Sequence, residues 1–132
     1  MKRLLLLFAT FLLAGCGHNV LPPEQELLAL SESEVRDTVL KYTPIRTERR
    51  EVERSLKREF RKSWNVIDYE SRELISKQGF SVPVSGGDYY FRSHFASART
   101  SPMTAKVLTV HFLFDYAGKL KDVSVEKWDD GP

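Results

Sequence analysis

The sequence predicts an α+β fold: two N-terminal helices packed on a mostly antiparallel three- to four-stranded sheet that ends in a C-terminal hairpin. Three observations support this. Apolar residues recur at helical spacing between residues 31 and 62. From residue 64 onward, apolar and polar residues alternate with the period of a strand. A short turn sequence, 115–118, joins the last two alternating runs. Helices followed by antiparallel strands are expected to cover one face of the sheet.

The first 15 residues are organised like a secretory signal. Lys2 and Arg3 precede the apolar run Leu4–Leu13, and Ala14-Gly15 supplies the small residues of a cleavage region. The apolar run is shorter than the roughly 20 residues that cross a bilayer as a helix. The only cysteine, Cys16, follows directly.

Residues 13–16, Leu-Ala-Gly-Cys, resemble the bacterial lipobox, where a signal peptidase cuts before the cysteine and the cysteine sulfur carries a diacylglycerol. The resemblance implies lipidation of Cys16 and an anchor in the cell envelope. Gly17 stands where an aspartate would imply inner-membrane retention in many enteric-type bacteria, so we expect the outer membrane, with the domain facing the periplasm. An unpaired reactive thiol, or a bridge to another chain, is the alternative.

We predict a signal peptide at 1–15, a lipidated cysteine and tether at 16–25, and a single α+β domain at 26–132. The tether ends in Pro22-Pro23, which favours an extended conformation. The chain has 20 basic and 18 acidic residues, and two of the basic ones leave with the signal, so the mature formal charge is zero. An exported chain without net charge is not expected to bind nucleic acid.

The first helix is predicted to begin at Ser31, whose spacing to Glu34 is that of a capping box, and to end before Pro44. The second is predicted from Glu48 to Lys62, with Thr47 as a candidate N-cap. Its buried stripe is expected to contain Val52, Leu56 and Phe60.

The second helix is rich in arginine, including Arg50, Arg54 and Arg58, and the acidic segment Glu24–Asp37 precedes it. A solvated face with mutual pairing is one interpretation, and the two segments could complement each other's charge. The other is a docking patch for an acidic partner or for phosphate groups at the membrane surface.

The remaining elements follow from alternation, glycine and proline. In order, we expect a short strand at 64–69, a short helix at 71–78, an edge segment at 80–84, a turn at 85–88, a strand at 89–96 and an exposed loop at 98–105. Leu108 to Phe114 and Leu120 to Val125 then form the hairpin, with Gly118 in its turn and a bulge that changes the apolar parity.

This order of elements behind a lipobox resembles the SmpA/OmlA (BamE-like) family of small outer-membrane lipoproteins. The hairpin sequence of residues 114–120 matches the family form Phe-x-x-x-Gly-x-Leu. Ile45-Arg46-Thr47, followed by Val52 and Leu56, stands where the family has a Gly-Met-Thr helix start, although the glycine and methionine are replaced. The resemblance implies a non-catalytic role in outer-membrane assembly through protein contacts, and it transfers no binding residues.

The sequence offers little for catalysis. His94 and His111 lie in strand patterns, and a serine triad with His94 and Asp88 would lack a nucleophile-elbow motif. The sequence contains no HExxH, CxxC or acidic calcium loop. We therefore expect no enzyme, no metal or other cofactor and no small-molecule substrate.

Two further segments are candidates for partner binding. Ser85-Gly86-Gly87-Asp88-Tyr89 is similar to the Ser-Gly-x-x-Tyr loop of MliC/PliC lysozyme inhibitors, which implies inhibition of an exported enzyme; a plain glycine turn is the alternative. Strand alternation places Tyr90, Arg92 and His94 on one face, which would be an interaction surface if helices leave it uncovered. The sequence thus predicts a lipid-anchored, non-enzymatic protein that binds another envelope protein, with inhibition as the alternative.

Overall fold

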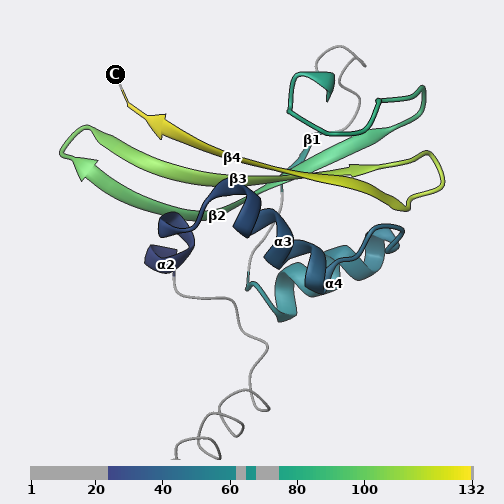
Figure 1. Cartoon of the computed structure of the whole chain (residues 1–132), viewed down its shortest axis with the longest axis horizontal. Helices are drawn as coiled ribbons and strands as arrows, with labels where there is room; N and C mark the ends of the chain where they lie inside the picture. The colour runs from purple at the N-terminus through teal and green to yellow at the C-terminus, as the bar shows by residue number, and fades with distance from the viewer. Residues whose placement is uncertain (1–23, 62–64, 68–74, 132) are drawn as a thin grey trace, which may run out of the picture.

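The computed structural model describes residues 24–61, 65–67 and 75–131, and it has the predicted α+β class. The strands are β1 (Asn65–Ile67), β2 (Tyr89–Ser101), β3 (Thr104–Phe114) and β4 (Leu120–Asp130), paired antiparallel in the order β1-β2-β3-β4. The helices α2 (Glu24–Ala29), α3 (Glu32–Tyr42) and α4 (Arg49–Arg58) all lie on one side of this sheet (Figure 1). The predicted signal and Cys16 lie outside the described residues.

The main hydrophobic core fills the space between the helices and the sheet. Aromatic rings from β2 and β3 stack across the strands, with the centroids of Phe91 and Phe112 5.2 Å apart. Phe60, just beyond α4, packs its ring 5.2 Å from that of Phe95. The aliphatic members are Leu27, Val35, Val39, Val52, Leu56, Leu108, Val110, Leu120, Val123 and Val125. The apolar alternation of the sequence therefore selects the face that the helices cover.

The start of α3 confirms the predicted capping box. The Glu34 amide donates to Ser31 Oγ, and the Ser31 amide donates to a Glu34 carboxylate oxygen, each at 3.1 Å. The helix ends at Tyr42, before Pro44, as predicted. The helix α2 was not predicted, and its first residue, Glu24, lies inside the segment assigned to the tether.

The helix α4 is shorter than the predicted range Glu48–Lys62, and Thr47 is not its N-cap. The Thr47 hydroxyl donates to the Pro44 carbonyl at 2.5 Å, and the Thr47 carbonyl accepts from the Leu120 amide at 2.8 Å. The second of these bonds attaches the start of α4 to the hairpin of β3 and β4. The helix cannot continue to residue 62, because Arg61 has a φ of 52°, in the left-handed region.

The segment after β1 covers part of the other face of the sheet. Phe80, Val82 and Val84 are not in a strand; they pack on the buried side chains of Tyr90 and Leu113. The expected edge segment is therefore a loop that covers the sheet. Its alternating apolar side chains pack on the sheet below them, and the segment is not itself a strand. Of the short helix expected at 71–78, residues 71–74 lie outside the described part.

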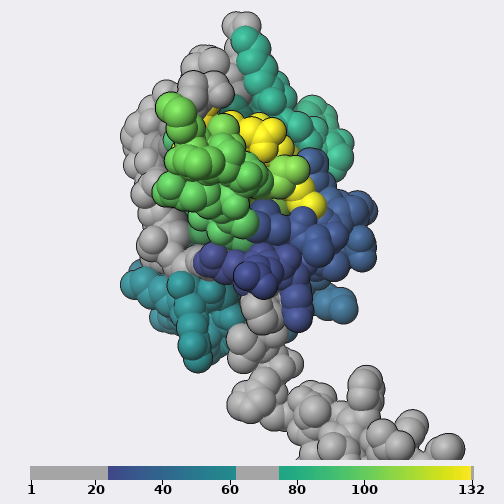
Figure 2. All heavy atoms as spheres, turned by 90° about the vertical axis from the view of Figure 1, so that its left-hand side faces the viewer, coloured from purple at the N-terminus to yellow at the C-terminus, as the bar shows by residue number. Residues whose placement is uncertain are grey.

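The segment 98–105 is largely exposed, as expected, but its prediction as a loop is wrong. Strands β2 and β3 continue through it, and only Pro102 and Met103 form the turn. Ser101 pairs with Thr104 in the register, and their hydroxyls lie 2.6 Å apart. Because both faces of this arm are largely polar, its strands lack the alternation that would have revealed them. Figure 2, which looks from this end, shows the arm lying over α2.

The turn between β3 and β4 is held by Asp115. Its side-chain oxygen accepts from the amides of Ala117 and Lys119 at 2.9 and 3.0 Å. Gly118 has a φ of 80°, which glycine adopts without strain. The register shifts between Leu113 and Phe114. As a result Leu120 and Val123 both face the main core, although they are three residues apart in β4.

Candidate binding site on the polar face of the sheet

A group of polar side chains occupies the face of β2, β3 and β4 that points away from the helices. The register places His94 opposite Thr109, and Thr109 opposite Glu126. Arg92 lies opposite His111 in the next row. We call the face formed by these residues and Trp128 the polar face. Its residues alternate along each strand with the core residues of the main cluster, so the two faces are set by the same period of two.

Thr109 is the centre of one half of the polar face. Its hydroxyl oxygen accepts a hydrogen bond from Trp128 Nε1 at 2.8 Å and lies 2.9 Å from His94 Nδ1. The Thr109 hydroxyl can donate its own hydrogen to His94 Nδ1 while it accepts from Trp128, because a hydroxyl has one hydrogen and two acceptor sites. In this arrangement His94 carries its hydrogen on Nε2, the nitrogen that does not contact Thr109.

His111 is the centre of the other half. It is 2% exposed, and its Nε2 lies 3.2 Å from a carboxylate oxygen of Glu126. Burial lowers the pKa of His111 below its ordinary value, and the bond to Glu126 opposes this without reversing it. Its Nδ1 is buried and has no hydrogen-bond partner among the described residues. A neutral imidazole thus lies beneath the polar face.

A cavity of about 290 Å³ opens on this face. It is lined by Gln78, Arg92, His94, Thr109, His111, Glu126 and Trp128. The Arg92 side chain is exposed and forms no ion pair or hydrogen bond within the described part of the chain. The cavity therefore combines one unpaired cation, a carboxylate already in contact with His111, and an indole oriented by Thr109.

Of the three residues predicted to form an exposed face of β2, the structure brings two to the surface. Arg92 and His94 are exposed and line the same cavity. Tyr90 is 2% exposed, so its predicted role in partner contact is wrong. Its ring packs 6.3 Å from that of Phe80, whose loop covers this part of the face.

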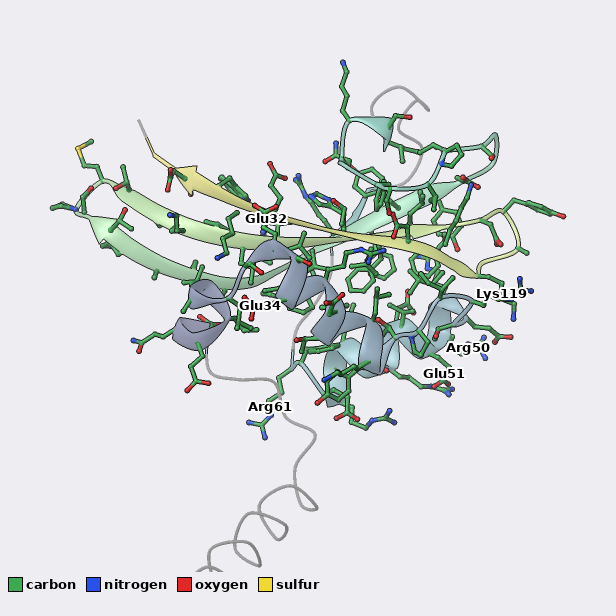
Figure 3. The ribbon with its side chains drawn as sticks, viewed as in Figure 1. Glu32, Glu34, Arg50, Glu51, Arg61 and Lys119 are labelled. Atoms are coloured by element: carbon green, nitrogen blue, oxygen red, sulfur yellow. The ribbon has the colours of Figure 1, made fainter. Side chains whose placement is uncertain are left out.

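The arginines of α4 form a separate surface, on the helical side of the molecule (Figure 3). Arg54 pairs with Glu51, and Arg58 pairs with Glu59 at 2.7 Å. Arg50 is exposed and forms no ion pair or hydrogen bond within the described residues, although its charge helps to lower the pKa of Glu48. The ion pairs that Arg49, Arg54 and Arg58 form stay within the helix and its end.

The acidic segment Glu24–Asp37 makes contacts with β4. The Glu32 carboxylate accepts from the Lys127 amide at 3.4 Å. Arg36 binds Asp122 at 2.7 Å. At the start of α4, Glu48 pairs with Lys119 of the hairpin turn at 2.9 Å, which lowers the pKa of Glu48 below its ordinary value. Charged side chains thus link both helices to β4 and its turn.

The predicted inhibitor-like loop is a tight turn fixed by Asp88. The Asp88 carboxylate accepts from the Ser85 amide and from Lys121 Nζ, each at 2.7 Å. Ser85 is exposed. Tyr89 is half-buried, with its ring stacked 5.4 Å from that of Phe114 and the Arg49 guanidinium 5.3 Å above it. The loop therefore exposes Ser85, whereas Tyr89 belongs to the core.

Sequence reasoning missed Thr109, Glu126 and Trp128, and it considered His111 only as a base or metal ligand. The sequence did contain a signal. Within residues 107–114 of β3, every residue is apolar except Thr109 and His111. Two polar residues at consecutive positions of one buried face indicate a cross-strand network. Their partners on β4 could not be assigned without the register.

Two findings concern other kinds of site. Within residues 24–61, 65–67 and 75–131, no three His, Cys, Asp or Glu side chains are grouped so that they could hold a metal ion. Within the same ranges, no helix has the length and apolar character needed to cross a bilayer.

No family model, curated protein or solved structure matches this chain.

Proposed function

We propose that this chain is a lipid-anchored, non-enzymatic lipoprotein of the cell envelope whose domain binds another envelope protein. The anchor is inferred from the lipobox-like sequence that ends at Cys16. When fully extended, residues 16–23 would hold the start of α2 at most roughly 25 Å from the lipid. A partner in or near the outer membrane is therefore within reach, in keeping with a role in outer-membrane assembly or maintenance.

The observation that carries the proposal is the polar face. Helices cover one side of the sheet, and the loop around Phe80 covers part of the other, but Arg92 and His94 stay exposed beside a half-buried Trp128. Arginine and tryptophan are enriched at the energetic centres of protein interfaces. The orientation of His94 and Trp128 is fixed by their contacts with Thr109 on the neighbouring strand, so a partner would pay little to order these two side chains.

The two histidines support a binding role over a catalytic one. His111 is buried and turned toward Glu126, and His94 contacts Thr109 through Nδ1. Both contacts join neighbouring strands and hold the polar face together. A general base needs reach to a substrate proton, and burial of His111 removes that reach.

The test is capture of membrane proteins by the full-length chain in gently solubilised cells. Arg92→Glu with His94→Glu should abolish capture of the partner, because the double change removes the cation of the polar face and adds two carboxylates beside Glu126. The matched control is Arg50→Glu on α4, which should leave capture unchanged. Capture that survives the double substitution would remove the polar face as the interface, and an intact mass without lipid at Cys16 would remove the anchor.

Inhibition of an exported enzyme is the second candidate, favoured by the rigid turn at residues 85–88. The bonds from Ser85 and Lys121 to Asp88 pre-organise an exposed loop, as inhibitory loops require. Ser85→Arg should then abolish stoichiometric inhibition of a cell-wall hydrolase. Tyr89→Ala would be a poor test, because loss of the ring also removes contacts with Phe114 and Arg49.

A further inference from the structure

We infer that the cavity of the polar face binds a carboxylate group carried by the partner, with Arg92 as the anchor and Trp128 as the apolar wall. The inference rests on the proposed function, because it names the chemistry of the group that the same face would recognise.

Arg92 is the one cationic side chain among the described residues that line the cavity, and it has no partner among them. A guanidinium presents a planar fork of donors that matches the two oxygens of a carboxylate. Elsewhere in the described structure, arginines such as Arg36, Arg49 and Arg58 already bind carboxylates of this chain. Arg92 is free to bind one from another molecule.

His94 supplies a second donor on the same face of the same strand. Its Nδ1 contacts Thr109 Oγ1 at 2.9 Å, and with the threonine as donor of this bond the ring carries its hydrogen on Nε2. Residues two apart in a strand point to the same side, which places this N–H and the Arg92 fork beside one cavity. Two donors beside one cavity suit an anion.

The charge balance favours a carboxylate over a phosphate. Glu126 lines the same cavity and brings one negative charge, and burial keeps His111 neutral at neutral pH. A dianion would be repelled by Glu126 with only Arg92 to balance it. A singly charged group is compatible with this arrangement.

The shape of the site favours a small group with an apolar portion. The volume of about 290 Å³ lies near the lower end of the range for small-molecule sites. The Trp128 indole is held by its bond to Thr109 at 2.8 Å, and its ring centroid lies 6.1 Å from that of His94. The pair forms a wall against which an aliphatic or aromatic side chain of the partner can pack. A single amino-acid residue of the partner that carries a free carboxylate and an apolar side chain has the size, the charge and the apolar portion that the site favours.

The experiment compares two probes of similar size that differ only in their terminal group, a carboxylate or an uncharged primary amide. N-acetyl-leucine and N-acetyl-leucinamide are titrated, at millimolar concentrations, into the full-length chain in detergent micelles. The amide resonances of Arg92 and His94 and the indole resonance of Trp128 are followed by NMR. We expect saturable shifts with N-acetyl-leucine and at least ten-fold weaker binding of the amide. Arg92→Gln should weaken binding at least ten-fold, and Arg50→Gln should leave it unchanged.

Several outcomes would overturn the inference. Equal binding of the two probes, equal binding by Arg92→Gln, or no binding of N-acetyl-leucine would each show that the cavity does not select a carboxylate. Tighter binding of inorganic phosphate would assign the site to a different anion. Partner capture by the full-length chain is a separate measurement that does not depend on these titrations. A failed carboxylate site and a failed protein interface can therefore be told apart.

Discussion

Arg36 of α3 and Asp122 of β4 form an ion pair of 2.7 Å that joins the two sides of the sheet at its edge. The second carboxylate oxygen of Asp122 accepts from the backbone and side chain of Ser81, at 2.7 and 3.0 Å. Arg36 also donates through Nε to the Val123 carbonyl at 2.9 Å. One buried carboxylate thus holds a helix from the main core and the loop that covers the other face.

Replacement of this carboxylate should destabilise the whole domain. We expect Asp122→Asn to lower the free energy of unfolding by about 2 kcal/mol, because hydrogen bonds to a charged group are lost inside the fold. Urea unfolding monitored by circular dichroism measures the change. Asp129→Asn, an exposed position of the same strand, should change stability by no more than about 0.5 kcal/mol.

The same residue predicts a pH dependence. Burial alone would raise the pKa of Asp122, but the bonds from Arg36 and Ser81 outweigh it and lower the pKa below its ordinary value of 3.8. The stabilisation is therefore complete above about pH 4 and is lost as pH falls through the lower pKa of the folded state. The stability gap between wild type and Asp122→Asn should shrink below pH 4, and a gap that stays constant would contradict this assignment.

His111 should make the domain less stable in mildly acidic solution. Because burial lowers the pKa of His111 from 6.5, the unfolded chain takes up a proton at a pH where the folded chain does not. Stability should fall as pH drops below 6.5, with a slope of at most about 1.4 kcal/mol per pH unit from this group.

Urea midpoints measured between pH 7 and pH 5 give the slope. His111→Phe should flatten it. Glu126→Gln should extend it to lower pH, because the contact that raises the pKa of His111 is removed. An unchanged slope in His111→Phe would assign the effect to other groups.

Two adjacent glycines of the turn at residues 85–88 should respond differently to alanine. Gly87 has a φ of 88°, and a methyl group there would lie 3.0 Å from Tyr116 Cβ. Gly86 is not in the left-handed region. We expect Gly87→Ala to cost about 1–2 kcal/mol and Gly86→Ala distinctly less. Thermal unfolding of the pair is an internal control, and equal melting temperatures would contradict the assigned backbone.

The capping box of α3 offers a test of local structure. Ser31→Ala should lower stability by about 1 kcal/mol, because the Glu34 amide loses its acceptor at 3.1 Å. Ser33→Ala, at an exposed position in the first turn of the helix, should cost much less. Equal losses would show that α3 does not begin at Ser31.

Local features of the fold were readable because short-range rules decide them. The capping spacing of Ser31 and Glu34, the helix end before Pro44 and the turn around Gly118 depend on neighbours in the sequence. The alternation of β3 likewise identified the residues that face the core. The arm at residues 98–105 escaped, because polar residues on both faces leave no alternation to detect.

The sequence by itself determined the class of the elements and their order, and it predicts export and lipidation from the segment that ends at Cys16. Only the tertiary structure decided that Tyr90 is buried while Arg92 is free, and that Thr109 contacts both His94 and Trp128. The physical reason is the strand register. Contacts between β2, β3 and β4 join residues far apart in the chain, and a shift of one residue would turn each side chain to the opposite face.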